Sequence, residues 1–159
     1  MTLTAKIQED TKSAMRAKDA LRLSTLRLLQ ASMKNRALEK RAKMVSAGNA
    51  PMDAELTDEE IVAVMRSELK KRKDAATEYE KGGRPESAAK EMAEAEILQS
   101  YLPAEASDAV IETAVAKAIA TIGKDQKQFG KIVGMAMKEL AGYASGERVS
   151  KAVKLALEG

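Results

Sequence analysis

The sequence predicts an all-α protein that has an N-terminal four-helix unit followed by a C-terminal three-helix bundle. The 159 residues are dominated by strong helix formers and only 3% of them are aromatic. Apolar residues recur with the helical period along nearly the whole chain, and no alternating strand pattern is present. Pro103 cannot continue a helix and restrains the residue before it. We therefore expect the two units to be residues 1–102 and 103–159.

The first two predicted helices cover residues 4–17 and 20–44. Asp19 lies between them, where its carboxylate can cap the second helix. On the first helix, Ile7, Ala14 and Met15 are expected to face the core. On the second, two adjacent lines form one broad buried stripe, made of Leu21, Thr25, Leu28, Ser32, Leu26, Leu29, Met33 and Ala37.

The next two predicted helices form a hairpin. A loop at residues 46–51 precedes Thr57, which forms a capping box with Glu60 at the start of a helix over 58–81. Gly82-Gly83 ends that helix, and Pro85 suits the first turn of the next one. The residues expected to face inward are Ile61, Met65, Leu69, Ala76 and Tyr79 on the first arm, and Ala88, Met92, Ala95 and Leu98 on the second.

Three shorter helices are predicted in the C-terminal unit, over residues 108–122, 126–140 and 147–157. Ser107 caps the first, Gly123 ends it, Asp125 precedes the second and Gly142 follows it. Gly130 and Gly134 lie one turn apart inside the second helix, where each costs about 1 kcal/mol relative to alanine. Either a neighbouring helix or an RNA backbone must approach closely there, and helix packing is the more common cause.

The composition removes most catalytic designs. Cysteine and histidine are both absent, which excludes a thiolate nucleophile, an imidazole base and an ordinary zinc site. Carboxylate or lysine chemistry stays open, but Glu91, Glu94 and Asp108 are interpreted as solvated helix residues. We expect no catalytic centre, cofactor or metal. No apolar run reaches about 18 residues and the N-terminus lacks a hydrophobic signal core, so a cytoplasmic protein is expected.

Positive charge is concentrated at the N-terminal end. Residues 1–43 hold eleven basic and four acidic side chains, although the whole chain has a net charge of only +3. Basic residues recur at helical spacing in three places, and each set either contacts phosphates or forms an ordinary solvated face. The candidate nucleic-acid contacts are Arg27, Lys34 and Arg41; Arg66, Lys70 and Lys73, widened by Lys71 and Arg72; and Lys131 and Lys138. Arg148, Lys151 and Lys154 add charge to the last helix.

Four segments resemble the YqeY family: LSTLRLLQASMKN at 23–35, ELKKRKDAATEYEKGGR at 68–84, EILQSYLP at 96–103 and FGKIVGMAMKELAG at 129–142. That family is related to the tail of the B subunit of the glutamine-dependent aminoacyl-tRNA amidotransferase. The resemblance implies a larger helical bundle followed by a three-helix bundle. It also implies a region that helps to hold tRNA, with the carbon–nitrogen ligase chemistry located in domains that this sequence does not contain.

One turn departs from the family pattern. After Gly142 the family usually has approximately Gly-Lys-Ala-Asp-Gly, whereas this sequence has Tyr143-Ala144-Ser145-Gly146. A phosphate contact by the missing lysine is therefore not expected here.

The sequence leaves two leading functional hypotheses, and a third, direct participation in amide transfer, is disfavoured because no catalytic centre is seen. The first is a non-catalytic accessory module that binds tRNA or another structured RNA by shape and phosphate contacts. The second is an adaptor that docks on a tRNA-charging synthetase or an amidotransferase assembly. Aromatic residues are too few and scattered to form a base-stacking platform, which argues against sequence-specific recognition of single-stranded RNA.

Overall fold

The computed structural model describes residues 1–49 and 54–159, and every regular element in these residues is helical. The all-α prediction is confirmed. The described chain divides into two compact units, residues 1–102 and 103–159, and each is considered separately below. Of the predicted loop at 46–51, Ser46 belongs to the preceding helix, while Ala50 and Pro51 lie outside the described residues.

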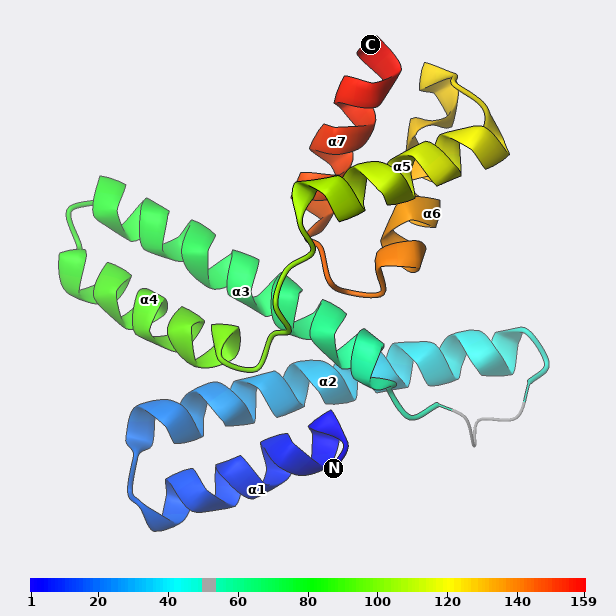
Figure 1. Cartoon of the computed structure of the whole chain (residues 1–159). Helices are drawn as coiled ribbons and strands as arrows, with labels where there is room; N and C mark the ends of the chain where they lie inside the picture. The colour runs from blue at the N-terminus through cyan, green and yellow to red at the C-terminus, as the bar shows by residue number, and fades with distance from the viewer. Residues whose placement is uncertain (50–53) are drawn as a thin grey trace. The chain divides into compact units, whose positions relative to one another are not determined.

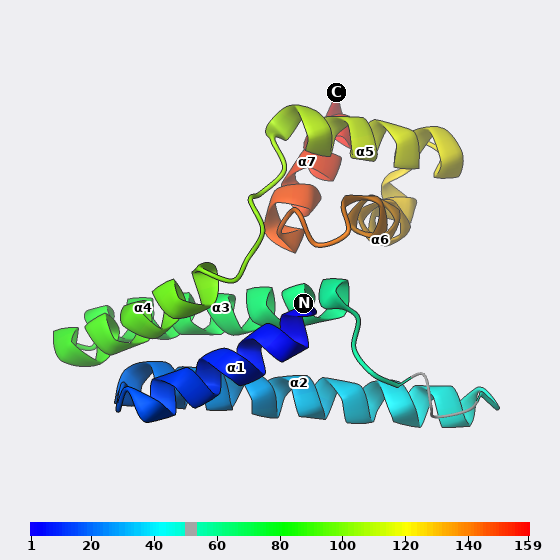
Figure 2. The ribbon, with the colours of Figure 1, turned by 60° about the horizontal axis from the view of Figure 1, so that its bottom comes forward.

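The first unit consists of two antiparallel helical hairpins. Helices α1 (Leu3–Arg16) and α2 (Ala20–Ser46) form one, and α3 (Asp58–Lys81) and α4 (Pro85–Gln99) form the other. The layer of α3 and α4 covers the layer of α1 and α2 (Figures 1 and 2). The C-terminal part of α2 continues past the beginning of α3.

Local capping explains where these helices begin and end. The Asp19 carboxylate accepts a hydrogen bond from the Arg22 N–H at 3.0 Å. Thr57 and Glu60 form the predicted capping box, in which the Glu60 carboxylate accepts from the Thr57 N–H at 2.8 Å. Gly83 has a φ of 70°, the left-handed conformation that glycine adopts without steric strain after a helix.

Aliphatic residues from all four helices form the core of the first unit. Ile7, Leu26, Leu29, Ile61, Met65 and Leu98 are at most 1% exposed. Three predicted core residues are instead solvent-exposed: Met15 (52%), Leu28 (52%) and Met92 (41%). The predicted stripe is too broad at Leu28, because α2 buries only Thr25, Leu26, Leu29 and Met33.

A polar cluster around Tyr101 ties the end of this unit to its first hairpin. The Tyr101 hydroxyl donates to the Asp10 carboxylate and accepts from the Arg22 guanidinium at 3.0 Å. The Lys6 amine lies 5.5 Å from the centre of the ring, within the range of a cation–π contact. Burial, followed by the hydrogen bond to Asp10, raises the pKa of Tyr101 to about 12. Tyr101 is 8% exposed, so it serves packing and not base stacking.

The second unit contains α5 (Asp108–Ile122), a short 3-10 turn (Gln126–Gln128), α6 (Phe129–Leu140) and α7 (Gly146–Glu158). Its core is built from Ile111, Val115, Ile132, Val149 and Val153, each at most 2% exposed. The helix predicted over 126–140 thus begins with a 3-10 turn, capped by the Asp125 carboxylate at the Lys127 N–H.

The turn that departs from the family pattern has a structural role in this chain. Ala141 adopts a φ of 46° and Gly142 a φ of 83°, which ends α6. Ala144 is fully buried, and the Ser145 hydroxyl caps α7 by accepting from the Arg148 N–H at 3.3 Å. Ser145, in place of the family's aspartate, therefore caps α7, whereas Tyr143, in place of the lysine, is 51% exposed.

Candidate nucleic-acid interface

The cations on α2 lie in a row on the outside of the first unit. Arg27, Lys34 and Arg41 are all exposed, and none of them forms an ion pair with another residue in the described part of the chain. The seven-residue spacing places successive charges about 10 Å apart along the helix. The predicted ridge therefore exists as a geometric feature, with its charges open to solvent.

The cations on α3 mostly lie close to acidic residues of the same helix, as their spacing predicts. Arg66 is half-buried, Lys70 lies 3.9 Å from the Asp74 carboxylate, and Lys73 is exposed without an ion pair among the residues described. Lys71 donates to Glu68 at 3.1 Å. Much of the positive charge on this helix is thus neutralised locally, which weakens its field at a distance.

Arg72 was expected to widen this patch, and that expectation is wrong. Its side chain is buried between α3 and α4, where it lies 3.0 Å from Glu68 and 3.2 Å from Glu94. Arg72 and Glu94 are each 7% exposed. Glu94 was interpreted as solvated and is instead one of the most buried polar residues described, so this cluster forms part of the contact between α3 and α4.

The buried cluster also fixes the charge state of Glu68. Its carboxylate accepts from Ser32 on α2 at 3.0 Å as well as from Lys71 and Arg72. Burial by itself would raise the pKa of Glu68, but these hydrogen bonds outweigh burial and lower it. A helix from each hairpin therefore contributes to one ionised network.

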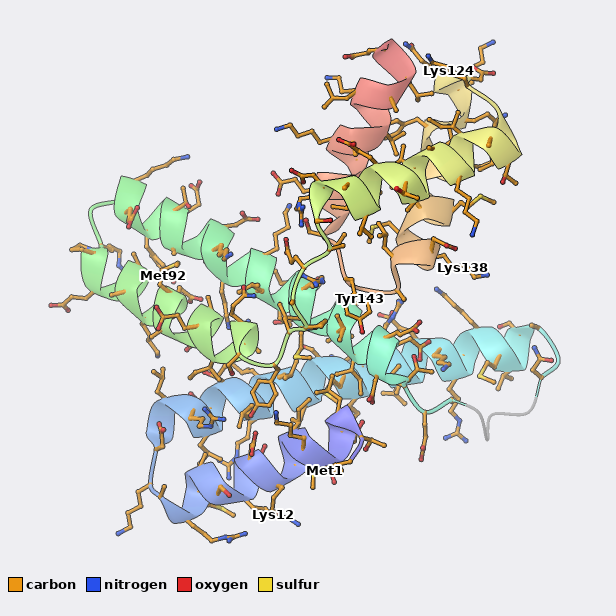
Figure 3. The ribbon with its side chains drawn as sticks, viewed as in Figure 1. Met1, Lys12, Met92, Lys124, Lys138 and Tyr143 are labelled. Atoms are coloured by element: carbon orange, nitrogen blue, oxygen red, sulfur yellow. The ribbon has the colours of Figure 1, made fainter. Side chains whose placement is uncertain are left out.

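In the second unit, α6 presents Lys131 and Lys138 on its solvent face (Lys138 is labelled in Figure 3). Both amines lack an ion-pair partner among the described residues, although Glu139 on the same helix binds Lys117 of α5 at 3.0 Å. Seven residues separate the two lysines, so they project in nearly the same direction. This face keeps its positive charge.

Gly130 and Gly134 lie beside these lysines, and nothing described packs on them. A Cβ atom built at either glycine would meet no heavy atom within 4 Å, apart from the helix's own backbone and chain neighbours. The expectation that another helix packs closely here is wrong. The outer surface of α6 therefore has a bare strip of backbone at Gly130 and Gly134, with Lys131 and Lys138 along one side of it.

Arg148, also considered as surface charge, is engaged within the second unit. Its guanidinium donates to Glu105 at 2.7 Å, to the Ala106 carbonyl at 2.9 Å and to Asp108 at 2.8 Å. These hydrogen bonds raise its pKa, with the bond to Asp108 the strongest influence. Asp108 is thus a partner of Arg148 and not a free carboxylate.

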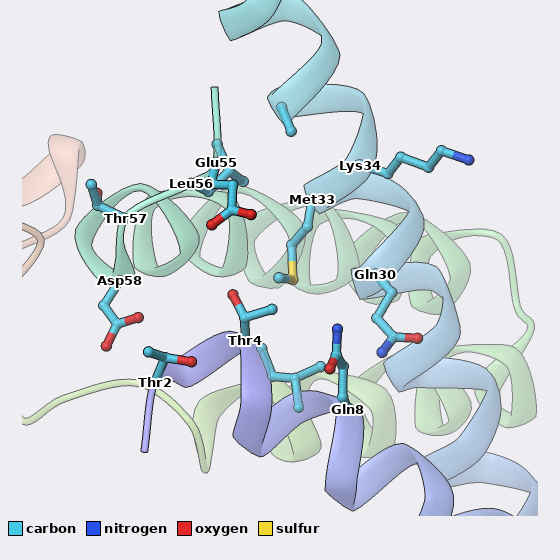
Figure 4. Close-up of a pocket in the computed structure, with 12 residues that line it drawn as sticks. Thr2, Thr4, Gln8, Gln30, Met33, Lys34, Glu55, Leu56, Thr57 and Asp58 are labelled. Carbon is cyan, nitrogen blue, oxygen red and sulfur yellow. The ribbon is translucent and has the colours of Figure 1, made fainter. Parts of the chain in front are cut away.

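The first unit also contains an open groove of about 820 Å³ that was not predicted from the sequence. Figure 4 shows Gln8 and Gln30 facing each other across it and Met33 projecting inward, while the Lys34 amine points away. Its walls come from residues 2–8, 30–37 and 55–58. No local motif could have revealed it, because the three segments are distant in sequence.

Together these observations define an all-helical protein with open cationic faces on two helices. Within the described ranges, no group of three acidic, histidine or cysteine side chains could hold a metal. None of the helices described is long and apolar enough to cross a membrane.

Comparison with known proteins identifies the family. The family model described as "Yqey-like protein" matches residues 4–157, and the chain belongs to this family. A relative from Pyrenophora tritici-repentis, named "Altered inheritance of mitochondria protein 41, mitochondrial", is 26% identical over 153 residues. That match covers 94% of this chain and 77% of the relative. The resemblance predicted from four segments is thus confirmed over nearly the whole sequence.

Proposed function

We propose that this protein is a non-catalytic accessory module that binds tRNA or another structured RNA through phosphate contacts. The observation that supports it best is the outer face of α6, where Lys131 and Lys138 have no neutralising partner among the described residues. Lysine amines at such positions attract phosphates and release condensed counterions, which favours binding at low salt.

The bare backbone strip at Gly130 and Gly134 supports the same proposal. Each glycine lowers helix stability by about 1 kcal/mol, and no packing within the described chain requires it. A sugar–phosphate backbone lying along this strip would come closer to α6 than any side chain would permit. Recognition would then depend on the shape of a folded RNA, as is usual for RNA helices.

Two other groups of cations contribute less to this proposal. On α3, Lys73 and the weakly paired Lys70 are available for phosphate contact, whereas Arg66 is half-buried. On α2, exposed aliphatic side chains such as Leu38 share the outer face with Arg27, Lys34 and Arg41, so the RNA proposal does not depend on these cations.

The proposal includes neither amide transfer nor a cofactor. The chain has no cysteine or histidine, and Glu94 and Asp108 are engaged in ion pairs. We also place the protein in the cytoplasm, while the name of the fungal relative places that protein in mitochondria. Cell fractionation tests the compartment, and purified chain should neither hydrolyse glutamine nor transfer ammonia to an aminoacylated tRNA.

The decisive experiment measures the affinity for a tRNA transcript over a range of salt concentrations. Binding should weaken steeply with salt, and Lys131→Gln with Lys138→Gln should reduce the log–log slope by roughly 1.5 to 2. Lys117→Gln is the matched control, because its amine already binds Glu139, and should change the slope much less. Absence of binding at low salt, or an unchanged slope in the double variant, would refute the proposal.

A further inference from the structure

The outward face of α2 carries a three-heptad apolar row that no other described element covers. Its members recur at alternating intervals of three and four residues, and all are exposed: Leu28, Ala31, Asn35, Leu38, Ala42 and Val45. The three large residues, Leu28, Leu38 and Val45, are 52%, 54% and 57% exposed. Single exposed aliphatic residues are ordinary, but a row in this register has the pattern of a coiled-coil seam.

The row lies on the side of α2 away from the core, because the buried line of this helix is Thr25, Leu26, Leu29 and Met33. One side of α2 is held in the fold, where Lys40 donates to the Glu55 carbonyl and the Glu60 carboxylate, both at 2.8 Å. The helix is therefore fixed in place while its outer seam stays open. A rigid open seam can bind a partner helix with little ordering of its own.

Two details of the seam match the rules for helix pairing. Ala31 and Ala42 are small enough to let a second helix approach. Asn35 lies midway between Leu28 and Ala42 at heptad spacing, and a single asparagine at such a position fixes the register of the two paired helices at some loss of stability. Arg27, Lys34 and Arg41 immediately precede Leu28, Asn35 and Ala42, so they occupy the flanking positions that form ion pairs with a partner.

These charges select the chemistry of the partner. The flank is uniformly cationic, and its three members have no ion pair among the residues described. A second copy in antiparallel orientation would oppose these cations to one another. In parallel orientation, the cations of one copy would face the other flank of the second copy, which consists of Ser32, Glu39 and Ser46. Only Lys34 would then meet an acidic residue, Glu39.

We propose that this face of α2 docks an amphipathic helix of a partner protein, whose apolar heptad row is flanked by acidic residues. RNA is the poorer occupant, because phosphates would leave Leu38 and Val45 in contact with water or polar groups. The inference goes beyond RNA binding and does not require it. It assigns to the two units different tasks, a protein contact on α2 and an RNA contact on α6.

The test uses a synthetic peptide of three heptads with leucine in its core positions, one central asparagine and glutamate on both flanks. Repulsion between its own glutamates keeps this probe monomeric at neutral pH. The full chain should bind it in fluorescence anisotropy, and an otherwise identical lysine-flanked peptide should bind at least about tenfold more weakly. Leu38→Asp should weaken binding by a similar factor. Leu155→Asp, at an exposed position of the second unit (61%), should have no effect.

Reversal of the charges on α2 tests the proposal with both peptides. The triple variant R27E/K34E/R41E should lose the glutamate peptide and gain the lysine peptide, which a merely misfolded variant could not do. Equal binding of both peptides by the unmodified chain, or no effect of Leu38→Asp, would overturn the proposal. Two further results would also overturn it. One is a dimer of the unmodified chain that Leu38→Asp dissociates, and the other is a triple variant that loses tRNA binding but does not exchange its peptide preference.

Discussion

The guanidinium of Arg72 and the carboxylate of Glu94 lie 3.2 Å apart between α3 and α4, and each residue is only 7% exposed. A buried pair of this kind adds little net stability, since both charges lose their hydration. Removal of one partner is a different matter, because it leaves the other charge buried without compensation. The pair therefore fixes how the two arms of the hairpin face each other.

Arg72→Met should lower the free energy of unfolding of the first unit by about 3–5 kcal/mol. The double change Arg72→Met with Glu94→Leu should lower it by less than the single change, because no isolated acid then remains at position 94. Urea denaturation followed by circular dichroism measures both. A double variant less stable than Arg72→Met would contradict this account of the hairpin.

Acid should destabilise the first unit through Glu60 and Glu68. Burial alone would raise the pKa of both carboxylates. Hydrogen bonds outweigh burial in each case, and those of Glu60 come from Lys40 and the Thr57 N–H. Both pKa values therefore lie below the ordinary 4.5. The folded state thus binds fewer protons than the unfolded state. Their stabilisation is present above about pH 4.5 and is lost as the pH falls through the folded-state pKa values.

Glu68→Gln should therefore lower stability near pH 7 and flatten the fall in stability between neutral and acidic pH. Thermal unfolding at several pH values provides the measurement. Glu78→Gln is a matched control, because that carboxylate is 74% exposed in its pair with Lys81. Equal pH profiles for Glu68→Gln and the unmodified chain would show that the network around Glu68 does not hold it ionised.

Tyr101 should respond to alkaline conditions in the opposite sense. Burial and the bond to Asp10 raise its pKa to about 12 from an ordinary 10.0, so the folded state holds this proton more tightly. Its contribution to stability is complete below about pH 10 and is lost as the pH rises through about 12. The measurement is the tyrosinate absorbance of the unmodified chain as a function of pH, from which the absorbance of Tyr101→Phe is subtracted to leave the titration of Tyr101. Asp10→Asn should lower its titration midpoint, and an unchanged midpoint would remove the role given to Asp10.

Local signals in the sequence predicted the ends of the helices well. Asp19, Thr57 and Ser107 cap the helices that follow them, because an N-cap depends only on residues within one turn. The sequence predicted less well which face of each helix is buried. Leu28 has the same side chain as Leu29, and only the positions of the helices that pack on α2 decide which one is covered.

The charged surface could be predicted only in part. Spacing correctly placed Lys131 and Lys138 on an open face of α6, since charged residues opposite an apolar stripe face water. It could not distinguish Arg72 from Lys73, because the burial of Arg72 depends on Glu94, which reaches it across the hairpin. The groove beside Gln8 and Gln30 was missed for the same reason, since its walls meet only after folding.

The two exposed glycines of α6 allow stability and binding to be separated. Gly134→Ala and Gly130→Ala should each stabilise the second unit by about 1 kcal/mol, because the added methyl group improves helix propensity and meets no neighbour. Under the RNA proposal the same changes should weaken tRNA binding, since the methyl group enters the strip along which the backbone lies. Thermal unfolding and tRNA titration on the same variants measure the two effects.

Gly146→Ala provides the control for this experiment. Gly146 begins α7 and likewise has no heavy atom within 4 Å of an added Cβ, but it is not on the helix that carries Lys131 and Lys138. Its replacement should leave tRNA affinity unchanged. If Gly134→Ala stabilises the unit and also leaves tRNA affinity unchanged, close approach of RNA to α6 is refuted. The glycines would then have no binding role on this face, and only the two lysine amines would remain as candidate contacts there.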